Sequence, residues 1–271
     1  MLIMTIIFES SALLARDRYS LFWDYYEVVL RRERSKEHMG LRRILQDHSQ
    51  QIQQLHERVG FELQVLSEAG AQSAATLTPQ ELRRLTWTIL YEAQFDPNGA
   101  DGALLDDIVR AATHRLVLLA PHPGQGFGFD VRSLQELMAA KYLVAQEPTK
   151  LRSMLRLAAA HPHWRNTWIF AAGALYSTPL QHQHELAASV VEHVDDQTPQ
   201  RLASIVPIAP RLALDLIDDG MARTLPRWRN RLIAVALRVL QEPVGPDFVP
   251  IARSILRYAD AGDQQRLTVV D

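Results

Sequence analysis

Two short stretches of the chain carry residue types that could do chemistry. The segment 124–128 reads GQGFG, and glycine-rich loops can hold phosphate groups through their backbone N–H groups. His184 and Glu185 begin a pattern like that of zinc-protease helices, in which a second histidine stands four residues after the first. Neither pattern is complete, because none of the three lysines follows a glycine and the position four after His184 is Ala188.

The rest of the composition offers little further chemistry. The 271 residues include no cysteine, which excludes disulfides and thiolate metal sites. Their formal net charge is −2, so the whole molecule does not favour a polyanionic partner. No Gly-x-Ser-x-Gly nucleophile motif occurs. We therefore expect no catalytic residue, no metal site, no cofactor and no enzymatic activity in this chain.

A repeated motif supplies the main candidates for interaction or packing. PHWRN begins at Pro162 and PRWRN begins 64 positions later. It places Trp164 beside Arg165 and Trp228 beside Arg229. A separation of 64 equals two units of 32, close to the periods of helical-hairpin repeats. Both tryptophans stand at predicted helix starts, which favours packing between repeats over exposed recognition.

A basic cluster gives a weaker indication of nucleic-acid binding. The segment 31–36 reads RRERSK, and Arg42 and Arg43 follow. Glu33 and Glu37 interrupt the cluster, so a solvated helix end is favoured over a DNA-binding surface.

The N-terminal segment 1–10, MLIMTIIFES, is apolar. It lacks the positive region of a signal peptide and is too short to span a bilayer. Its apolar pattern begins without a helix cap, as if the chain started inside a domain. We expect this segment to mediate self-association or partner binding, and we expect no membrane insertion.

Most of the chain shows helical periodicity. Helices are predicted over 17–34, 41–66, 79–92, from the turn at 96–99 to about 115, and from 133 onward; short apolar runs at 116–120 and 127–131 flank a Gly/Pro turn and predict a β-hairpin. Capping boxes are predicted at Thr78 with Glu81 and at Ser133 with Glu136. In the helix from 133, one apolar face is expected, formed by Leu134, Leu137, Met138 and Tyr142. From 148, proline-containing breaks separate shorter helices.

These elements predict a mainly α fold. Residues 1–146 would form a winged-helix-like helical module with one β-hairpin. Residues 147–271 would form a short HEAT-like α-solenoid.

The junction of hairpin and helix resembles a known family. The segment 129–132 reads FDVR and leads into SLQELMAAKYL at 133–143. This is similar to NACHT-type NTPases of the STAND class, in which a strand ending Phe-x-His leads into a Ser-Phe-Gln-Glu-Tyr-Phe-Ala-Ala-like helix. The segments RDRYSLF at 16–22 and THRLVLL at 113–119 extend the resemblance, which covers roughly 1–175. The family's phosphate-contacting histidine is Val131 here, beside the candidate Arg132, and the family's nucleotide-binding core is not in this chain.

The resemblance implies a non-catalytic regulatory or sensor module of a cytoplasmic NTPase, split or truncated, that acts in signalling or defence. Its expected partner is a protein, either the NTPase core or a second copy bound through the N-terminal apolar segment. The alternative is a free-standing helical-repeat scaffold or a nucleic-acid-binding regulator. An NTPase reading frame directly upstream would favour the first hypothesis.

Overall fold

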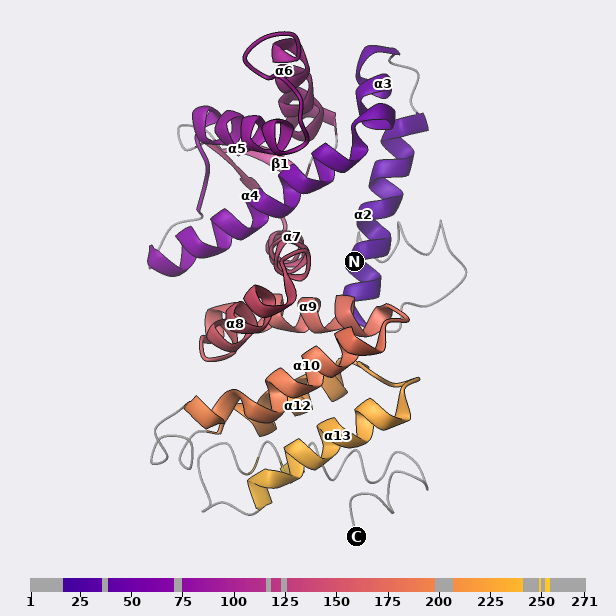
Figure 1. Cartoon of the computed structure of the whole chain (residues 1–271), viewed down its shortest axis with the longest axis vertical. Helices are drawn as coiled ribbons and strands as arrows, with labels where there is room; N and C mark the ends of the chain where they lie inside the picture. Colours follow the sequence, from indigo (N-terminus) through magenta and orange to yellow (C-terminus); the bar gives the residue numbers. More distant parts are fainter. Residues whose placement is uncertain are drawn as a thin grey trace. The chain divides into compact units, whose positions relative to one another are not determined.

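The computed structural model describes residues 17–35, 39–70, 75–115, 118–122, 126–197, 207–240, 249 and 252–253. These residues form eleven α-helices and one two-stranded antiparallel sheet (Figure 1). The prediction of a mainly α fold with one β-hairpin is confirmed. Of the helices described, none is both long enough and apolar enough to cross a membrane. The apolar segment 1–10 and its predicted role lie outside the described residues.

The described residues separate into two compact units. The first covers 19–145, and the second covers 17–18 and the described residues from 146 onward. The winged-helix-like and HEAT-like characters of these units stay predictions.

The first unit consists of helices, a π-helical turn and the hairpin. In chain order these are α2 (Arg18–Ser35), α3 (Met39–Asp47), α4 (Ser49–Ala69), α5 (Pro79–Glu92), α6 (Gly102–Arg110), η1 (Ala111–Arg115), β1 (Leu119–His122), β2 (Gly126–Phe129) and α7 (Arg132–Val144). The single helix predicted over 41–66 is divided at His48, between α3 and α4. The ring of His48 lies edge-on to Phe95 with centroids 5.9 Å apart, so the break also contributes to packing.

The first unit is built around the packing of α4 on α7 (Figure 1). At Gly60 the two helices approach so closely that an added Cβ would lie 2.6 Å from Cβ of Met138 and 2.8 Å from the backbone N of Ala139. Only glycine fits there without displacing α7. The predicted apolar residues Leu134, Leu137 and Met138 are buried, and Tyr142 is half-buried. The whole segment 134–140 is buried with them, so this part of α7 is enclosed on more than the predicted face.

Polar side chains are enclosed in the same region and are satisfied within it. Nε2 of Gln135 donates to Oε1 of Gln64 at 3.0 Å, and both side chains are buried. Nε of Arg132 donates to Oε1 of the buried Glu136 at 3.2 Å. Buried polar groups are costly unless hydrogen-bonded, so these bonds hold α7 in one register.

The two predicted capping boxes differ in outcome. At Thr78 the prediction is confirmed: the N–H of Glu81 donates to Oγ1 of Thr78 at 3.2 Å, and the N–H of Thr78 donates to Glu81 at 2.7 Å. At Ser133 it is wrong. The helix begins at Arg132 with Val131 as its N-cap, and that N-cap side chain makes no capping bond. Ser133 therefore lies inside the first turn, and Glu136 points into the core instead of back to the cap.

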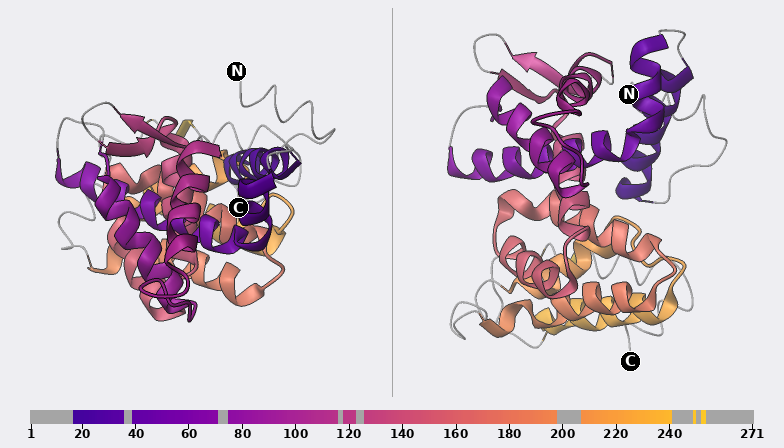
Figure 2. Two further views of the ribbon diagram at one scale, coloured as in Figure 1. Left: turned by 90° about the horizontal axis from the view of Figure 1, so that it is seen from above. Right: turned by 45° about the horizontal axis from the view of Figure 1, so that its top comes forward.

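The hairpin pairs Leu119 with Phe129 and His122 with Gly126. Its strands begin and end a few residues away from the predicted runs. Leu77 adds an isolated bridge to Phe127, with both N···O distances 2.8 Å. Gly126 has φ +112°, and a Cβ there would lie 2.3 Å from the Leu77 carbonyl oxygen. This glycine of the GQGFG segment thus serves backbone geometry. In both views of Figure 2 the hairpin and α2 lie on different sides of the first unit.

The second unit consists of helices and short 3-10 turns. In chain order these are α8 (Pro148–Ala159), η2 (Pro162–Trp164), α9 (Arg165–Ser177), α10 (Gln181–His193), η3 (Val194–Gln197), α12 (Ile208–Asp218), α13 (Pro226–Leu237) and η4 (Arg238–Leu240). Every residue of α9 from Thr167 to Tyr176 is buried, and α8, α10 and α12 pack against it. The core of this unit therefore surrounds α9.

The repeated motif occupies related but unequal positions. Trp164 ends the 3-10 turn before α9, whereas Trp228 lies within the first turn of α13. Further along, Ile169 of α9 and its counterpart Ile233 of α13 are both buried. The two segments bury corresponding positions, but their helices begin at different points of the motif.

Candidate functional site

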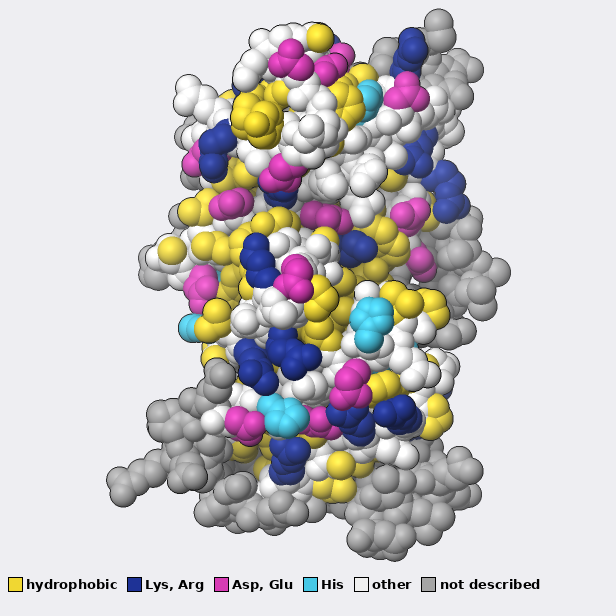
Figure 3. Space-filling view, viewed as in Figure 1, with side chains coloured by type: hydrophobic (Ala, Val, Ile, Leu, Met, Phe, Trp, Pro, Cys, Tyr) yellow, Lys and Arg dark blue, Asp and Glu magenta, His cyan; other side chains and the backbone are white. Residues whose placement is uncertain are grey.

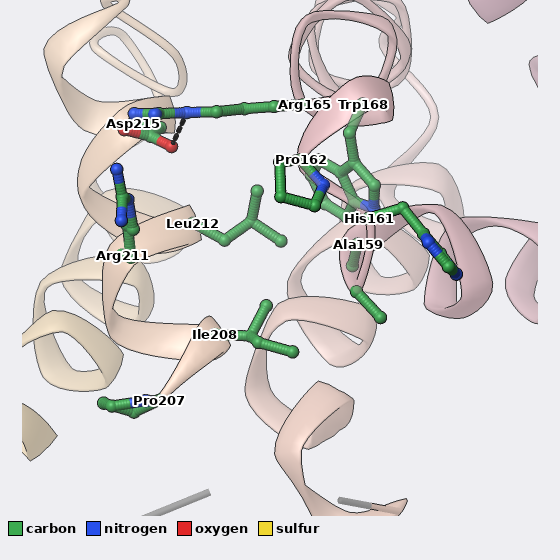
Figure 4. A pocket seen from close by; sticks show the side chains of 11 residues that line it. Ala159, His161, Pro162, Arg165, Trp168, Pro207, Ile208, Arg211, Leu212 and Asp215 are labelled. Atoms are coloured by element: carbon green, nitrogen blue, oxygen red, sulfur yellow. Dashed lines mark hydrogen bonds and ion pairs between the residues drawn. The ribbon is translucent and has the colours of Figure 1, made fainter. Parts of the chain in front are cut away.

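A groove of about 260 Å³ lies within the second unit (Figure 4). One wall is a stripe of α12 formed by Ile208, Arg211, Leu212 and Asp215. These residues are spaced i, i+3, i+4 and i+7, the spacing that places side chains on one face of a helix. The sequence of α12 therefore determines which side chains enter the groove.

The opposite wall is the corner between α8 and α9. It comprises Ala159, His161, Pro162 and Trp168. The indole of Trp168 is fully buried, and its Nε1–H donates to the carbonyl of Leu155 at 2.9 Å. This bond ties α9 to α8 and fixes the corner, so the wall is rigidly supported.

An ion pair joins the two walls. Nε of Arg165 donates to Oδ2 of Asp215 at 2.6 Å, and Nη2 donates to Oδ1. In Figure 4 this pair spans the groove above Leu212 and Pro162. A bidentate arginine–carboxylate pair fixes orientation as well as distance, so it sets the spacing of α9 and α12 at this end.

A second carboxylate fixes the other end of α12. Asp195 of η3 accepts from the N–H groups of Ile208 and Ala209, each at 3.0 Å. The first N–H groups of a helix lack intrahelical partners, and a negative charge there is favoured by the helix dipole. Asp195 thus caps α12 from outside its own segment and holds the N-terminal end of the groove wall.

The lining suits binding more than chemistry. Leu212, Ile208, Pro162 and Trp168 supply an apolar floor, and the arginines at the rim supply hydrogen-bond donors. Among the described residues, no group of three or more histidine, aspartate or glutamate side chains is placed to hold a metal ion. The groove can accept an apolar side chain of a partner, with a polar group of that partner beside it.

Comparison with protein-family models, with curated proteins and with solved structures finds no match. The site is therefore interpreted from its own geometry.

The five site residues predicted from the sequence have different surroundings in the structure. Arg165 lines the groove, as described above. Trp164 and Trp228 are buried, so neither is an exposed recognition residue, and packing is the role that their surroundings support. Arg229 is partly buried on α13. Arg132 belongs to the first unit and pairs with Glu136.

The surroundings of Trp228 explain its burial. His184 of α10 lies edge-on to its ring with centroids 5.7 Å apart. Nε2 of His184 is 2.7 Å from the carbonyl oxygen of Thr178. A carbonyl can only accept, so Nε2 carries the proton. His184 is therefore a buried packing residue that joins α10 to α13.

Sequence reasoning missed Arg231, which completes this contact. Its guanidinium lies 5.2 Å from the Trp228 ring centroid and donates to Glu192 and Glu185 of α10 at 2.6 to 3.0 Å. These bonds raise the pKa of Arg231 and lower the pKa of the Glu185 carboxyl. The sequence does contain an indication of this contact: Glu185 and Glu192 are seven residues apart, a spacing that places both carboxylates on one face of α10.

Of the basic cluster, Lys36 and the side chain of Arg42 lie outside the described residues. Arg31 and Arg32 are exposed, but Glu33 between them and Arg34 is buried. Nε of Arg34 donates to the carbonyl of Leu45 at 3.1 Å. On the face seen in Figure 3, basic and acidic side chains are interspersed. The charge pattern there gives no support to a nucleic-acid-binding surface.

Proposed function

We propose that this chain is a non-catalytic regulatory module of a NACHT-like NTPase that acts through protein contacts in a cytoplasmic signalling or defence process. The supporting observation is the role of α7. The residues that carry the family resemblance are those that organise the first unit: Gln135 bonds to Gln64, and the backbone of Ala139 abuts Gly60. The resemblance thus lies in positions with a demanding structural role.

The groove of the second unit supplies a surface for such contacts. Its apolar floor and its arginine-bearing rim suit a segment of the NTPase core that carries a leucine- or phenylalanine-sized side chain next to a carboxylate. Apolar anchors in a pocket with a polar rim are the common form of protein recognition. Binding there would hold the core in one conformation.

The test requires an NTPase core encoded directly beside this chain. Nucleotide turnover of that core is measured while this chain is added, and association is measured by calorimetry. We expect saturable binding and a change in turnover. Ile208→Glu, which places a charge in the half-buried lining, should weaken binding about ten-fold or more, because an apolar contact is lost and a carboxylate must be desolvated.

Leu157→Glu is the matched control. Leu157 lies in the same unit, does not line the groove and is 69% exposed, so the same substitution should leave binding unchanged. Circular dichroism should show that both variants keep their helix content. An adjacent core that neither binds this chain nor changes its turnover would contradict the proposal.

A further inference from the structure

The first unit contains a polar cavity of about 400 Å³ between α2, α4 and α7. Its lining comprises Glu27, Leu30, Arg34, Ser49, Gln50, Gln53, Gln54, Glu57, Lys141, Val144 and Ala145. Small-molecule sites typically measure about 300 to 1,000 Å³, so this cavity has room for a small ligand.

The cavity exists because α2 is attached to its neighbours at two separated points. Tyr26 is fully buried, with its Oη 3.3 Å from Nδ1 of His56 on α4. Two turns later, Nε of Arg34 donates to the carbonyl of Leu45. Glu27 and Leu30 lie between these attachments and face the cavity. The space thus lies where α2 packs on its neighbours, and it is open to solvent.

Glu57 is the most unusual group in the lining. It is only 7% exposed, and it accepts one hydrogen bond from Nε2 of Gln53 at 2.7 Å. A carboxylate offers about four acceptor positions, and a buried charge is costly unless it is paired. Within the described residues, this one neutral donor leaves most of the acceptor capacity of Glu57 unused.

Positive charge lines the same cavity. Lys141 of α7 lies close enough to act on the Glu57 carboxyl, and its Nζ is 4.2 Å from the ring centroid of Trp23. Arg34 of α2 also belongs to the lining. The lining therefore contains two carboxylates and two cations, and three glutamine amides can donate or accept.

We propose that this cavity binds a small zwitterion, with its ammonium group on the carboxylates of Glu57 and Glu27 and its anionic group on Lys141 and Arg34. A simple anion would bring its charge against Glu57, and a simple cation would bring its charge against Lys141. Only a molecule with both charges complements both sets of side chains. This inference depends neither on the NTPase relationship nor on the groove of the second unit.

Binding should depend on pH in a defined direction. Burial raises the pKa of the Glu57 carboxyl, while the Gln53 hydrogen bond and the Lys141 charge oppose the rise. An ammonium group requires the ionised carboxylate. Affinity should therefore increase as pH rises through the pKa of Glu57 and then stay level until an ammonium group of the ligand or Lys141 loses its proton. Glu27 and Arg34 of α2 also face this site, and their charges add to the field at Glu57.

The test uses probes of one chain length that differ in charge. 2-Aminohexanoate and 6-aminohexanoate are zwitterions, hexanoate is an anion and hexylammonium is a cation. Binding to the full chain is measured by calorimetry and by saturation-transfer NMR. We expect at least one zwitterion to bind at least about ten-fold more tightly than either singly charged probe, since charge-assisted hydrogen bonds are worth that much or more.

Substitutions in the cavity test which side chains contact the zwitterion. Glu57→Gln keeps the shape and removes the charge, and it should weaken zwitterion binding about ten- to a hundred-fold and remove its rise with pH. Lys141→Met should weaken it similarly. Glu62→Gln, on α4 but outside the lining, should change nothing. Equal affinity for all probes, no binding of any probe, or unchanged affinity in Glu57→Gln with its fold intact would each overturn the proposal.

Discussion

The two units hold their helices together in different ways. In the first, α4 and α7 meet at a glycine, and polar side chains such as Gln64, Gln135 and Glu136 are buried between and around them. In the second, α9 is surrounded by apolar side chains, and ion pairs such as Arg165–Asp215 join helices near the surface. The first arrangement includes a helix contact where only glycine fits, and the second is built on an enclosed apolar helix.

This difference has a consequence for function. Exposed ion pairs contribute little stability each, so the second unit can alter its surface residues at small cost and is suited to present a binding groove. Buried polar groups are costly when left unpaired, so the first unit is sensitive to single changes and to pH.

Removing either repeated tryptophan should strongly destabilise the second unit. Trp164→Ala and Trp228→Ala should each lower the free energy of unfolding by about 3 to 5 kcal/mol, because each empties a buried site. Urea unfolding followed by circular dichroism measures the loss. Trp87→Ala, at the half-buried Trp87 of α5, is the control and should cost less. An unchanged melting temperature in either variant would remove the repeat assignment at that position.

Acid should destabilise the first unit through His56. Burial lowers the pKa of this imidazole to about 4, partly opposed by the backbone of Ala112, whereas an unfolded histidine titrates near 6.5. Between these values the unfolded state binds more protons, so stability falls as pH drops from about 6.5 to 4, by about 3 kcal/mol in total.

The pH experiment compares the wild-type chain with His56→Gln by urea unfolding at several pH values. The His56-dependent loss should be absent in the variant. The raised pKa of Glu57 acts in the opposite direction, because a group that binds protons more tightly when folded stabilises the fold as pH falls. The difference between the two chains isolates His56, and identical pH profiles would show that it is not buried in its neutral form.

A methyl group at the α4–α7 contact should destabilise the first unit by about 1 to 3 kcal/mol. Gly60→Ala forces Cβ to within 2.8 Å of α7 backbone atoms, and overpacked cores typically lose this much. Gly70→Ala, where the nearest atom would be 3.5 Å away, is the matched control. Hydrogen exchange should show the loss in α4 and α7; a Gly60→Ala chain as stable as wild type would contradict the close contact.

The smallest expected losses of stability come from substitutions at the two predicted helix caps, and the two losses should differ. Thr78→Ala should cost about 1 kcal/mol, the usual value for a lost N-cap, since both bonds of its capping box are present. Ser133→Ala should cost much less, because Ser133 lies inside the first turn of α7 and is not its N-cap. Equal losses in thermal unfolding would restore the capping box at Ser133.

Local signals in the sequence predicted local structure well. Thr78, Pro79 and Glu81 act within one turn, so the start of α5 could be predicted from four residues. The mainly helical pattern and the hairpin likewise depend on short-range periodicity. The start of α7 was predicted one residue late. The sequence favours a local capping box between Ser133 and Glu136, but in the structure the Glu136 side chain is buried in the core instead.

The candidate sites depend on long-range contacts, and these were largely not predictable. Arg165 was identified, but its partner Asp215 is 50 residues away, and no local rule pairs them. Asp195 caps a helix that begins 13 residues later. Glu57 lies off the apolar stripe of α4 in the sequence, so only the packing of α2 and α7 shows that it is buried and lines the polar cavity.

We predict that this chain has no NTPase chemistry of its own. Phosphoryl transfer needs a backbone cradle, a lysine on the transferred phosphates and a held Mg²⁺, and no segment of the sequence supplies these together. Calorimetric titration of the chain with Mg-ATP and Mg-GTP, with phosphate release followed in parallel, tests this directly. We expect no binding tighter than roughly millimolar, about −4 kcal/mol, and no release. Micromolar binding, or turnover abolished by a single substitution in this chain, would contradict the account.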